Sequence, residues 1–152
     1  MPGVALCWAM RRSGKISLMI VEDDVNIRFL FEAAAQRAEI FEPVAIAVDG
    51  QAAFDALQAA ASATLPALIV SDLCMPRMTG LELLRAVKND TVLRTIPVAI
   101  ITSSDNPNDR ELALAAGACS FVPKPYGVDA LTKALIALWE CCDKAAGASN
   151  PT

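Results

Sequence analysis

The stretch "ALIVSDLCMPRMTG", residues 67–80, joins an apolar run to a loop whose first acid is Asp72. The run "ALIV" is continuously apolar, which is typical of a strand buried on both faces of a parallel sheet. Pro76 and Gly80 predict a turn soon after it. A carboxylate where a buried strand meets a turn is a candidate functional group, because loops held by a rigid scaffold often carry binding and catalytic side chains.

Four other apolar runs predict strands, and they occupy residues 16–21, 43–48, 96–102 and 119–123. Helical stripes, with apolar residues three and four apart, alternate with the strands. The fourth helix follows an Asn106-Pro107 cap signal, and the last helix carries an apolar stripe from Leu131 to Cys142. Five strands alternating with five helices predict an α/β protein with a flavodoxin-like, doubly wound, five-stranded parallel sheet in the order 2-1-3-4-5.

Composition limits the classes of partner. The 152 residues suit one domain, with 55% hydrophobic and 20% charged residues. A net charge of −4 argues against direct binding to nucleic acid, which needs a surplus of Lys and Arg. No apolar run approaches the ~20 residues that span a bilayer, so no membrane association is predicted.

The cysteines show no CxxC pair, and the chain has no histidine to complete a mixed zinc site. Their odd number favours reduced thiols in a cytoplasmic protein. We expect each of them to be a small apolar filler of the interior. They are Cys7, Cys74, Cys119, Cys141 and Cys142.

Polar side chains follow four of the predicted strands. They are Glu22, Asp23 and Asp24 after the first, Asp72 after the third, Thr102 and Ser103 after the fourth, and Lys124 after the fifth. In the predicted strand order the acids converge in one crevice, where they repel one another unless a cation intervenes. Carboxylate oxygens with open positions for water and phosphate favour Mg²⁺. Taken singly, "EDD" also fits a solvated loop, Asp72 a turn cap and Lys124 a surface lysine.

Such a site permits phosphoryl transfer to a carboxylate, with Mg²⁺, the Lys124 ammonium and the Thr102 hydroxyl each neutralising one peripheral oxygen. Here the chain resembles a response-regulator receiver domain, the phosphoacceptor of two-component signalling. The motifs "VEDD", "DLCMPRMTGLELL", "IPVAIITSS" and "FVPKP" stand in that family's order and approximate spacing. The resemblance covers residues 16–142.

The resemblance implies a role for each of seven residues. Asp72 is the phosphorylated nucleophile, Asp23 the direct metal ligand, Glu22 a ligand through water, the Cys74 backbone carbonyl a further ligand, Lys124 the phosphate clamp, Thr102 the switching hydroxyl and Phe121 the aromatic that moves with it. Asp24 is left as an auxiliary or solvated acid. The resemblance also implies a cis bond between Lys124 and Pro125, and the Cys74 side chain is expected to control access of water to the acyl phosphate.

The predicted function is that of a single-domain response regulator. It accepts a phosphoryl group on Asp72 from a histidine kinase or a histidine phosphotransfer protein, dephosphorylates itself slowly and has no other enzymatic activity. We expect a leader at residues 1–15, a receiver domain at 16–142 and a tail at 143–152, with no DNA-binding domain after it. Output is then by protein contact, either to a downstream target or in a homodimer through the fourth helix, fifth strand and fifth helix.

Three alternatives stay open. Trp139 and Ile136 lie off the last helix's stripe and fit either a partner surface or peripheral packing. A receiver fold can also act as an adapter without phosphorylation. A Mg²⁺-dependent phosphohydrolase with an aspartyl nucleophile is disfavoured, because Cys74 stands where that chemistry usually has a second acid.

Overall fold

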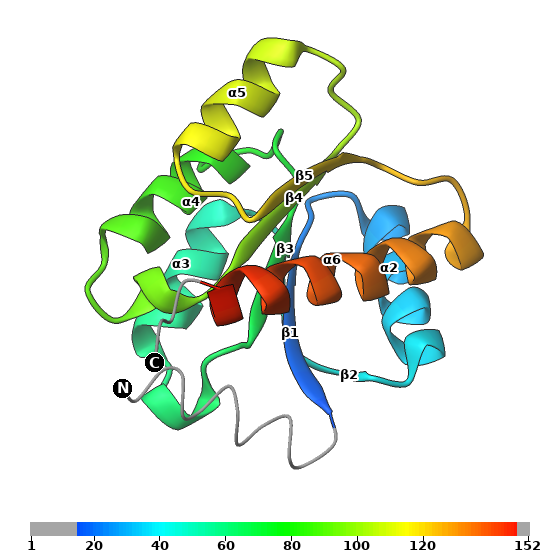
Figure 1. Ribbon diagram of the computed structural model, residues 1–152, viewed down its shortest axis with the longest axis horizontal. Helices are drawn as coiled ribbons and strands as arrows, with labels where there is room; N and C mark the ends of the chain where they lie inside the picture. Colours follow the sequence, from blue (N-terminus) through cyan, green and yellow to red (C-terminus); the bar gives the residue numbers. More distant parts are fainter. Residues whose placement is uncertain (1–14, 149–152) are drawn as a thin grey trace.

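The computed structural model describes residues 15–148, which form a five-stranded parallel sheet with helices on both faces (Figure 1). The strands are β1 (Ile16–Val21), β2 (Phe41–Ala47), β3 (Leu68–Ser71), β4 (Val98–Thr102) and β5 (Ser120–Pro123). The helices are α2 (Val25–Ala38), α3 (Gly50–Ala59), α4 (Gly80–Asn89), α5 (Pro107–Ala115) and α6 (Val128–Ala148), with 3₁₀ turns η1 (Ser62–Thr64) and η2 (Leu93–Thr95). The sheet order β2-β1-β3-β4-β5 confirms the predicted flavodoxin-like fold.

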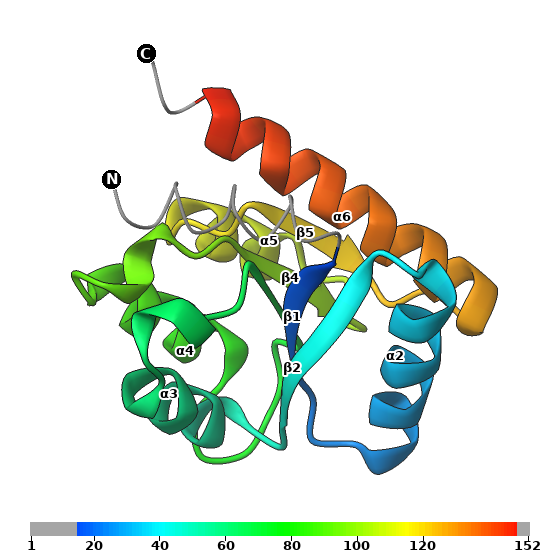
Figure 2. The same cartoon turned by 90° about the horizontal axis from the view of Figure 1, so that it is seen from below.

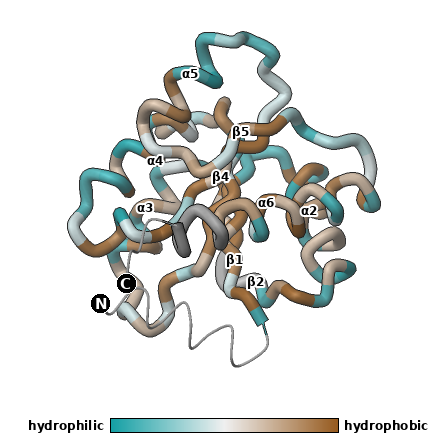
Figure 3. Tube along the Cα trace, viewed as in Figure 1, coloured by the Kyte–Doolittle hydropathy of each residue, from teal (hydrophilic) through white to brown (hydrophobic). Residues whose placement is uncertain are grey.

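Side chains of β1, β3 and β4 alternate between two cores. In β1, Met19 and Val21 join the core under α3, α4 and α5, whereas Leu18 and Ile20 join the core under α2 and α6. Figure 2 shows the sheet between these two groups of helices, and Figure 3 shows apolar stretches along the strands and also on the helices. Each fully buried Leu or Ile stabilises the fold by roughly 1.5–3 kcal/mol. Because helices cover both faces of the sheet, a functional site is expected at the ends of the strands.

The strand ladder continues past the strands and fixes the residues that follow them. The Asp72 N–H donates to the Val21 carbonyl over 3.0 Å, and the Lys124 N–H donates to the Thr102 carbonyl over 2.9 Å. Because parallel strands point the same way, these residues lie at one edge of the sheet, the upper edge in Figure 1.

Side-chain caps begin several of the helices, and the cap at Asn106 is the one that the sequence predicts. Asn106 caps α5 through its side chain, which accepts from the Asn108 N–H, and a proline occupies the first turn. Thr79 caps α4 by accepting from the Glu82 N–H. Asp24, the spare acid of "EDD", caps α2.

Several boundaries differ from the predicted ones by one or two residues, such as the start of the fourth strand at Val98 and not at Ile96, and two differences have a structural reason or a larger size. The second strand begins at Phe41, not Pro43, because Phe41 pairs with Ile16 in the β1–β2 ladder. The last helix continues past Cys142 to Ala148. The predicted leader falls almost wholly on residues 1–14, which lie outside the described part of the chain.

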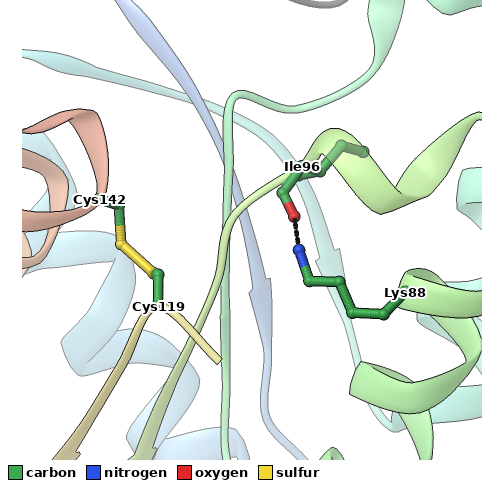
Figure 4. The surroundings of a disulfide bond; sticks show 4 residues. All are labelled: Lys88, Ile96, Cys119 and Cys142. Carbon is green, nitrogen blue, oxygen red and sulfur yellow. Dashed lines mark hydrogen bonds between the residues drawn. A yellow bond between two sulfur atoms is a disulfide. The ribbon is translucent and has the colours of Figure 1, made fainter. Parts of the chain in front are cut away.

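The prediction that every cysteine is a reduced thiol filling the interior is wrong, although Cys142 is buried and Cys74 and Cys141 are reduced as predicted. Cys119 and Cys142 form a disulfide that ties the start of β5 to α6 (Figure 4). Cys74 and Cys141 are free but exposed, so they are not interior fillers. The pairing arises because the apolar stripe of α6 packs on the sheet beside β5, which brings together two thiols far apart in sequence. Cys7 lies outside the described residues.

A partner surface at Trp139 is likewise ruled out, because only 7% of this residue is exposed. Trp139 packs with Leu131, Leu135 and Leu138 in the core under α2 and α6. The buried face of α6 therefore includes the position eight residues after Leu131, as wide helix stripes do. Ile136 is only partly exposed. No helix within residues 15–148 is both long and apolar enough to cross a membrane.

Candidate functional site

Asp72 lies at the carboxyl end of β3, and only 7% of it is exposed. Its Oδ1 accepts from the Leu73 N–H over 2.7 Å, and its Oδ2 lies 2.9 Å from Lys124 Nζ. Gly80 closes the loop that follows, since its N–H donates to the Leu73 carbonyl over 2.8 Å and a Cβ there would collide with the Asp72 carbonyl oxygen. The carboxylate is therefore held by contacts on both of its oxygens.

Lys124 joins two acids that come from different strands. Its Nζ also lies 2.7 Å from Oε1 of Glu22, a side chain that is fully buried just after β1. This contact has the distance of an ion pair, but no hydrogen bond of good geometry reaches the buried Glu22 Oε1. One cation thus faces two buried carboxylates, and Glu22 retains capacity to bind a further cation.

The buried charges change the protonation behaviour of this group. Burial raises the pKa of Glu22 above its usual 4.5, the Lys124 contact opposes that rise, and the charge of Asp72 adds to it. For Lys124, burial acts to lower the pKa, but contacts with Glu22 and Asp72 outweigh burial and raise it. Lys124 is therefore held as an ammonium between the carboxylates.

Three acids form a cluster that suits a metal ion. Ligand oxygens of Glu22, Asp23 and Asp72 all lie within 4.8 Å of one another. Arg28 holds the loop that carries two of them, because its Nη1 donates to the Glu22 and Asp23 carbonyls, each over 2.9 Å. The Asp24 carboxylate instead accepts from the Asn26 N–H and so caps α2, and Asp24 is not in the cluster. An all-oxygen set with an exposed member fits a hard divalent cation that retains waters.

Thr102 lies at the carboxyl end of β4 and Phe121 lies in β5, the two strands that follow β3 in the sheet. Thr102 is 1% exposed at the end of β4, and its hydroxyl accepts from the Ser104 N–H over 3.2 Å. Phe121 is buried in β5 against the core under α3, α4 and α5. Arg110 of α5 donates to the Phe121 carbonyl over 2.8 Å, a contact that links α5 to the edge strand and was not predicted from sequence.

Cys74 lies on the loop between β3 and α4 with an exposed side chain. It lines a hollow of about 340 Å³ together with Leu73, Met75, Thr79, Leu81 and Asp109. The sequence leaves the isomer of the Lys124-Pro125 bond open, and the structure has it trans, unlike what the resemblance implies, since no peptide bond in the described part is cis. Trans is the more stable form even before proline.

A second ion pair lies next to this loop and was missed from the sequence. Asp49 is 5% exposed and accepts two hydrogen bonds from Arg77, over 2.8 and 3.0 Å. The hydrogen bonds from Arg77 lower the pKa of Asp49, with help from the Ala52 N–H. The sequence signal for this ion pair is a single arginine, Arg77, in a predicted turn. Such a residue does not indicate which acid it will contact.

With this geometry in place, the comparisons with known proteins identify the fold's relatives. A family model described as "Response regulator receiver domain" matches residues 18–136. Response regulator PleD of Caulobacter vibrioides is 38% identical over 109 residues, which are 71% of this chain and 22% of PleD. Response regulator Rre1 of Synechocystis is 31% identical over 116 residues, 76% of this chain and 48% of Rre1. The chain thus spans less than half the length of these two relatives.

Solved structures of response regulators also resemble this chain. Chemotaxis response regulator CheY4 of Vibrio cholerae superposes with a TM-score of 0.70 at 28% identity, covering 82% of this chain and 98% of CheY4. The phosphorylated cyanobacterial phytochrome response regulator RcpA gives 0.69 at 27% identity, covering 83% and 92%. The Mn²⁺-bound form of response regulator Rcp1 gives 0.69 at 25% identity, covering 82% and 92%. From its matched span and its sheet of five parallel strands, the chain belongs to the response regulator receiver domain family.

Proposed function

We propose that this protein is a phosphoacceptor that takes a phosphoryl group onto Asp72 from a histidine kinase or a histidine phosphotransfer protein and signals by changing a protein-binding surface. Receiver domains in general are the phosphoacceptors of two-component systems and interact with histidine kinases and downstream targets. The observation that carries the proposal for this chain is the contact of Lys124 Nζ with both Asp72 and Glu22 inside the acidic cluster.

The proposed reaction uses the residues at the sheet edge. Asp72 attacks the phosphorus in line, forming an acyl phosphate while the bond to the donor's imidazole nitrogen breaks. The Lys124 ammonium neutralises one peripheral oxygen, and the Thr102 hydroxyl donates to another. The donor histidine comes from a partner, because this chain has none.

The acidic cluster is proposed to hold Mg²⁺. Asp23 and Asp72 are direct ligands in this proposal, the Cys74 backbone carbonyl is a third, and Glu22 binds through water. The bound ion supplies charge neutralisation at the phosphoryl oxygens and between the facing carboxylates. The buried Glu22 Oε1, which has no well-aligned hydrogen bond, and the all-oxygen donor set support the proposal. Mn²⁺ in the similar Rcp1 structure is consistent with it.

Signal output is proposed to pass through Thr102 and Phe121 to the face formed by α5, β5 and α6. Both residues are buried on adjacent strands, so a shift of one leaves space or strain for the other. That face then contacts a downstream protein or a second copy of the chain. The exposed Cys74 thiol, on the acceptor loop between β3 and α4, is proposed to influence water access and so the lifetime of the acyl phosphate. The single-domain state and a cytoplasmic location remain predictions.

The deciding experiment is incubation with Mg²⁺ and a small acyl phosphate, followed by intact mass. The wild type is expected to gain one phosphoryl group, and Asp72→Asn none. Asp129→Asn is the matched control, because Asp129 is an exposed aspartate at the start of α6. An adduct that persists in Asp72→Asn contradicts the proposal. A partner whose binding is the same for the wild type and Asp72→Asn would favour the phosphorylation-independent adapter.

A further inference from the structure

The loop after the acceptor is fastened to a helix that carries none of the residues in the proposed reaction. Arg77 lies on that loop, between β3 and α4, and its guanidinium donates through Nε and Nη2 to the two oxygens of Asp49, 28 residues earlier in the chain. Asp49 is buried and also caps α3, because its Oδ1 accepts from the Ala52 N–H over 2.8 Å. One carboxylate therefore holds both the start of α3 and the acceptor loop.

A backbone contact beside the ion pair fastens the same two segments. The Gly50 N–H donates to the Met78 carbonyl over 3.2 Å. A Cβ on Gly50 would clash with that carbonyl oxygen, so glycine is what lets the loop approach the helix start. Arg77 and Met78 are thus docked as a unit on the start of α3.

The backbone at Arg77 also points to a required conformation. Its φ is +63°, in the left-handed region that costs free energy for any residue except glycine. Such a conformation persists where surrounding contacts hold it, and the two parallel hydrogen bonds to Asp49 hold it together with the Gly50–Met78 backbone contact. A planar guanidinium can make this fork, whereas the single ammonium of lysine cannot.

Two anchors therefore define the path of the acceptor loop. One joins Gly80 to Leu73 at the loop's ends, and the other joins Arg77 and Met78, near its middle, to the start of α3. Cys74, whose carbonyl is the proposed metal ligand, lies between them and is exposed. The first anchor alone fixes where the loop begins and ends but leaves the path of the intervening backbone free.

We propose that Arg77 and Asp49 are positioning residues for the metal site, holding the loop between β3 and α4 so that the Cys74 carbonyl faces the acidic cluster. This inference rests on the proposed function, because it assumes a divalent cation at Glu22, Asp23 and Asp72. Neither Arg77 nor Asp49 touches the cation or the phosphoryl group. They act through the backbone that carries the third protein ligand.

The test is calorimetric titration of the intact protein with Mg²⁺ alone, together with the Mg²⁺ dependence of phosphorylation by a small acyl phosphate. Arg77→Gln and Asp49→Asn are each expected to weaken Mg²⁺ binding about tenfold, the size typical for residues that orient metal ligands. Asp49→Asn keeps an oxygen to cap α3, so loss of the cap is not the cause. Arg77→Lys should give a smaller loss, and Arg85→Gln, on the exposed side of α4, none.

The double variant Arg77→Gln/Asp49→Asn separates positioning from two independent structural effects. It should bind Mg²⁺ no more weakly than either single variant, because each substitution breaks the same contact. Circular dichroism confirms folding, and Arg77→Lys keeps the test valid if Arg77→Gln fails to fold. Wild-type Mg²⁺ affinity in folded Arg77→Gln and Asp49→Asn overturns this inference alone. A wild type that binds no Mg²⁺ and gains no phosphoryl group overturns the proposed function, and this inference with it.

Discussion

The ammonium of Lys124 lies 2.9 Å from Oδ2 of Asp72, although the two residues are 52 positions apart in the chain. β5 delivers the lysine and β3 the aspartate, and β4 lies between them. The contact therefore depends on the parallel sheet's common edge and not on local sequence. It also leaves Asp72 paired with a cation before any metal or phosphoryl donor arrives.

Replacement of Lys124 is expected to destabilise the protein. In Lys124→Met, Glu22 and Asp72 lose their shared cation, and a buried acceptor without a partner costs about 1–3 kcal/mol. Urea unfolding without added metal measures the loss in free energy of unfolding. Lys133→Met is the control, because Lys133 is exposed on α6 and such changes stay within about 0.5 kcal/mol. Equal stability of the wild type and Lys124→Met would show that the ion pairs contribute nothing.

The sheet order and the meeting of the acids with Lys124 could be predicted from the sequence, because both follow from the alternation of strands and helices. Apolar runs that alternate with helical stripes allow few sheet orders, and a parallel sheet gathers the residues that follow its strands. The convergence of Glu22, Asp23, Asp72 and Lys124 follows from those two facts alone. The roles of these residues in phosphoryl transfer remain proposals.

The parts that escaped prediction depend on packing between elements. Cys119 and Cys142 meet because α6 lies against β5, and no local spacing encodes that distance. Trp139 turns inward because the buried face of α6 is wider than its leucine stripe. Arg77 finds Asp49 only when the acceptor loop reaches α3. In each case the partner is set by tertiary structure and not by a motif.

Divalent metal should stabilise the folded protein through the acidic cluster. A ligand that binds only the folded state adds about 1.4 kcal/mol when present at ten times its dissociation constant. Mg²⁺ is therefore expected to raise the thermal midpoint, and a chelator to reverse the rise. Asp23→Asn should remove most of the rise in thermal midpoint, because Asp23 is a proposed direct ligand and the exposed member of the cluster. Asp129→Asn should respond as the wild type does. An undiminished rise in Asp23→Asn would exclude that residue as a ligand.

The disulfide is expected to contribute about 3 kcal/mol to the free energy of unfolding, because it closes a loop over a sequence separation of 23. Cys142→Ser should lose this amount under non-reducing conditions, and reduced wild type should lose nearly as much. Cys141→Ser is a matched control, since the neighbouring thiol is free and exposed. Alkylation with and without reductant should label Cys119 and Cys142 only after reduction. Labelling of both without reductant would rule out the bond.

Thr102→Ala tests the proposed switch. The variant should still be phosphorylated, because Asp72 and Lys124 are intact, but α5 and β5 should no longer change when the phosphoryl group arrives. Hydrogen exchange of peptides from these elements, before and after phosphorylation, measures the response. Thr64→Ala, an exposed threonine in η1, should keep the wild-type response. A wild-type exchange response in Thr102→Ala would remove Thr102 from this role.

The Arg77–Asp49 pair should make stability depend on pH in the acid range. Arg77 lowers the pKa of Asp49 in the folded state below its ordinary 3.8, and Asp55 is the other acid that acts on the Arg77 guanidinium. A carboxylate with a lowered folded pKa stabilises the fold above the unfolded pKa, and this contribution is lost as pH falls through the folded value. Arg77→Gln should therefore be less stable than the wild type at pH 7, and the difference should shrink below about pH 4. Urea unfolding of both proteins across this range measures it.

In an Asp49→Asn background the same substitution should have an effect that does not change with pH, because the titrating partner is gone. If the difference in free energy of unfolding between the wild type and Arg77→Gln stayed constant from neutral to acid pH, the contact of Arg77 with ionised Asp49 would not stabilise the fold.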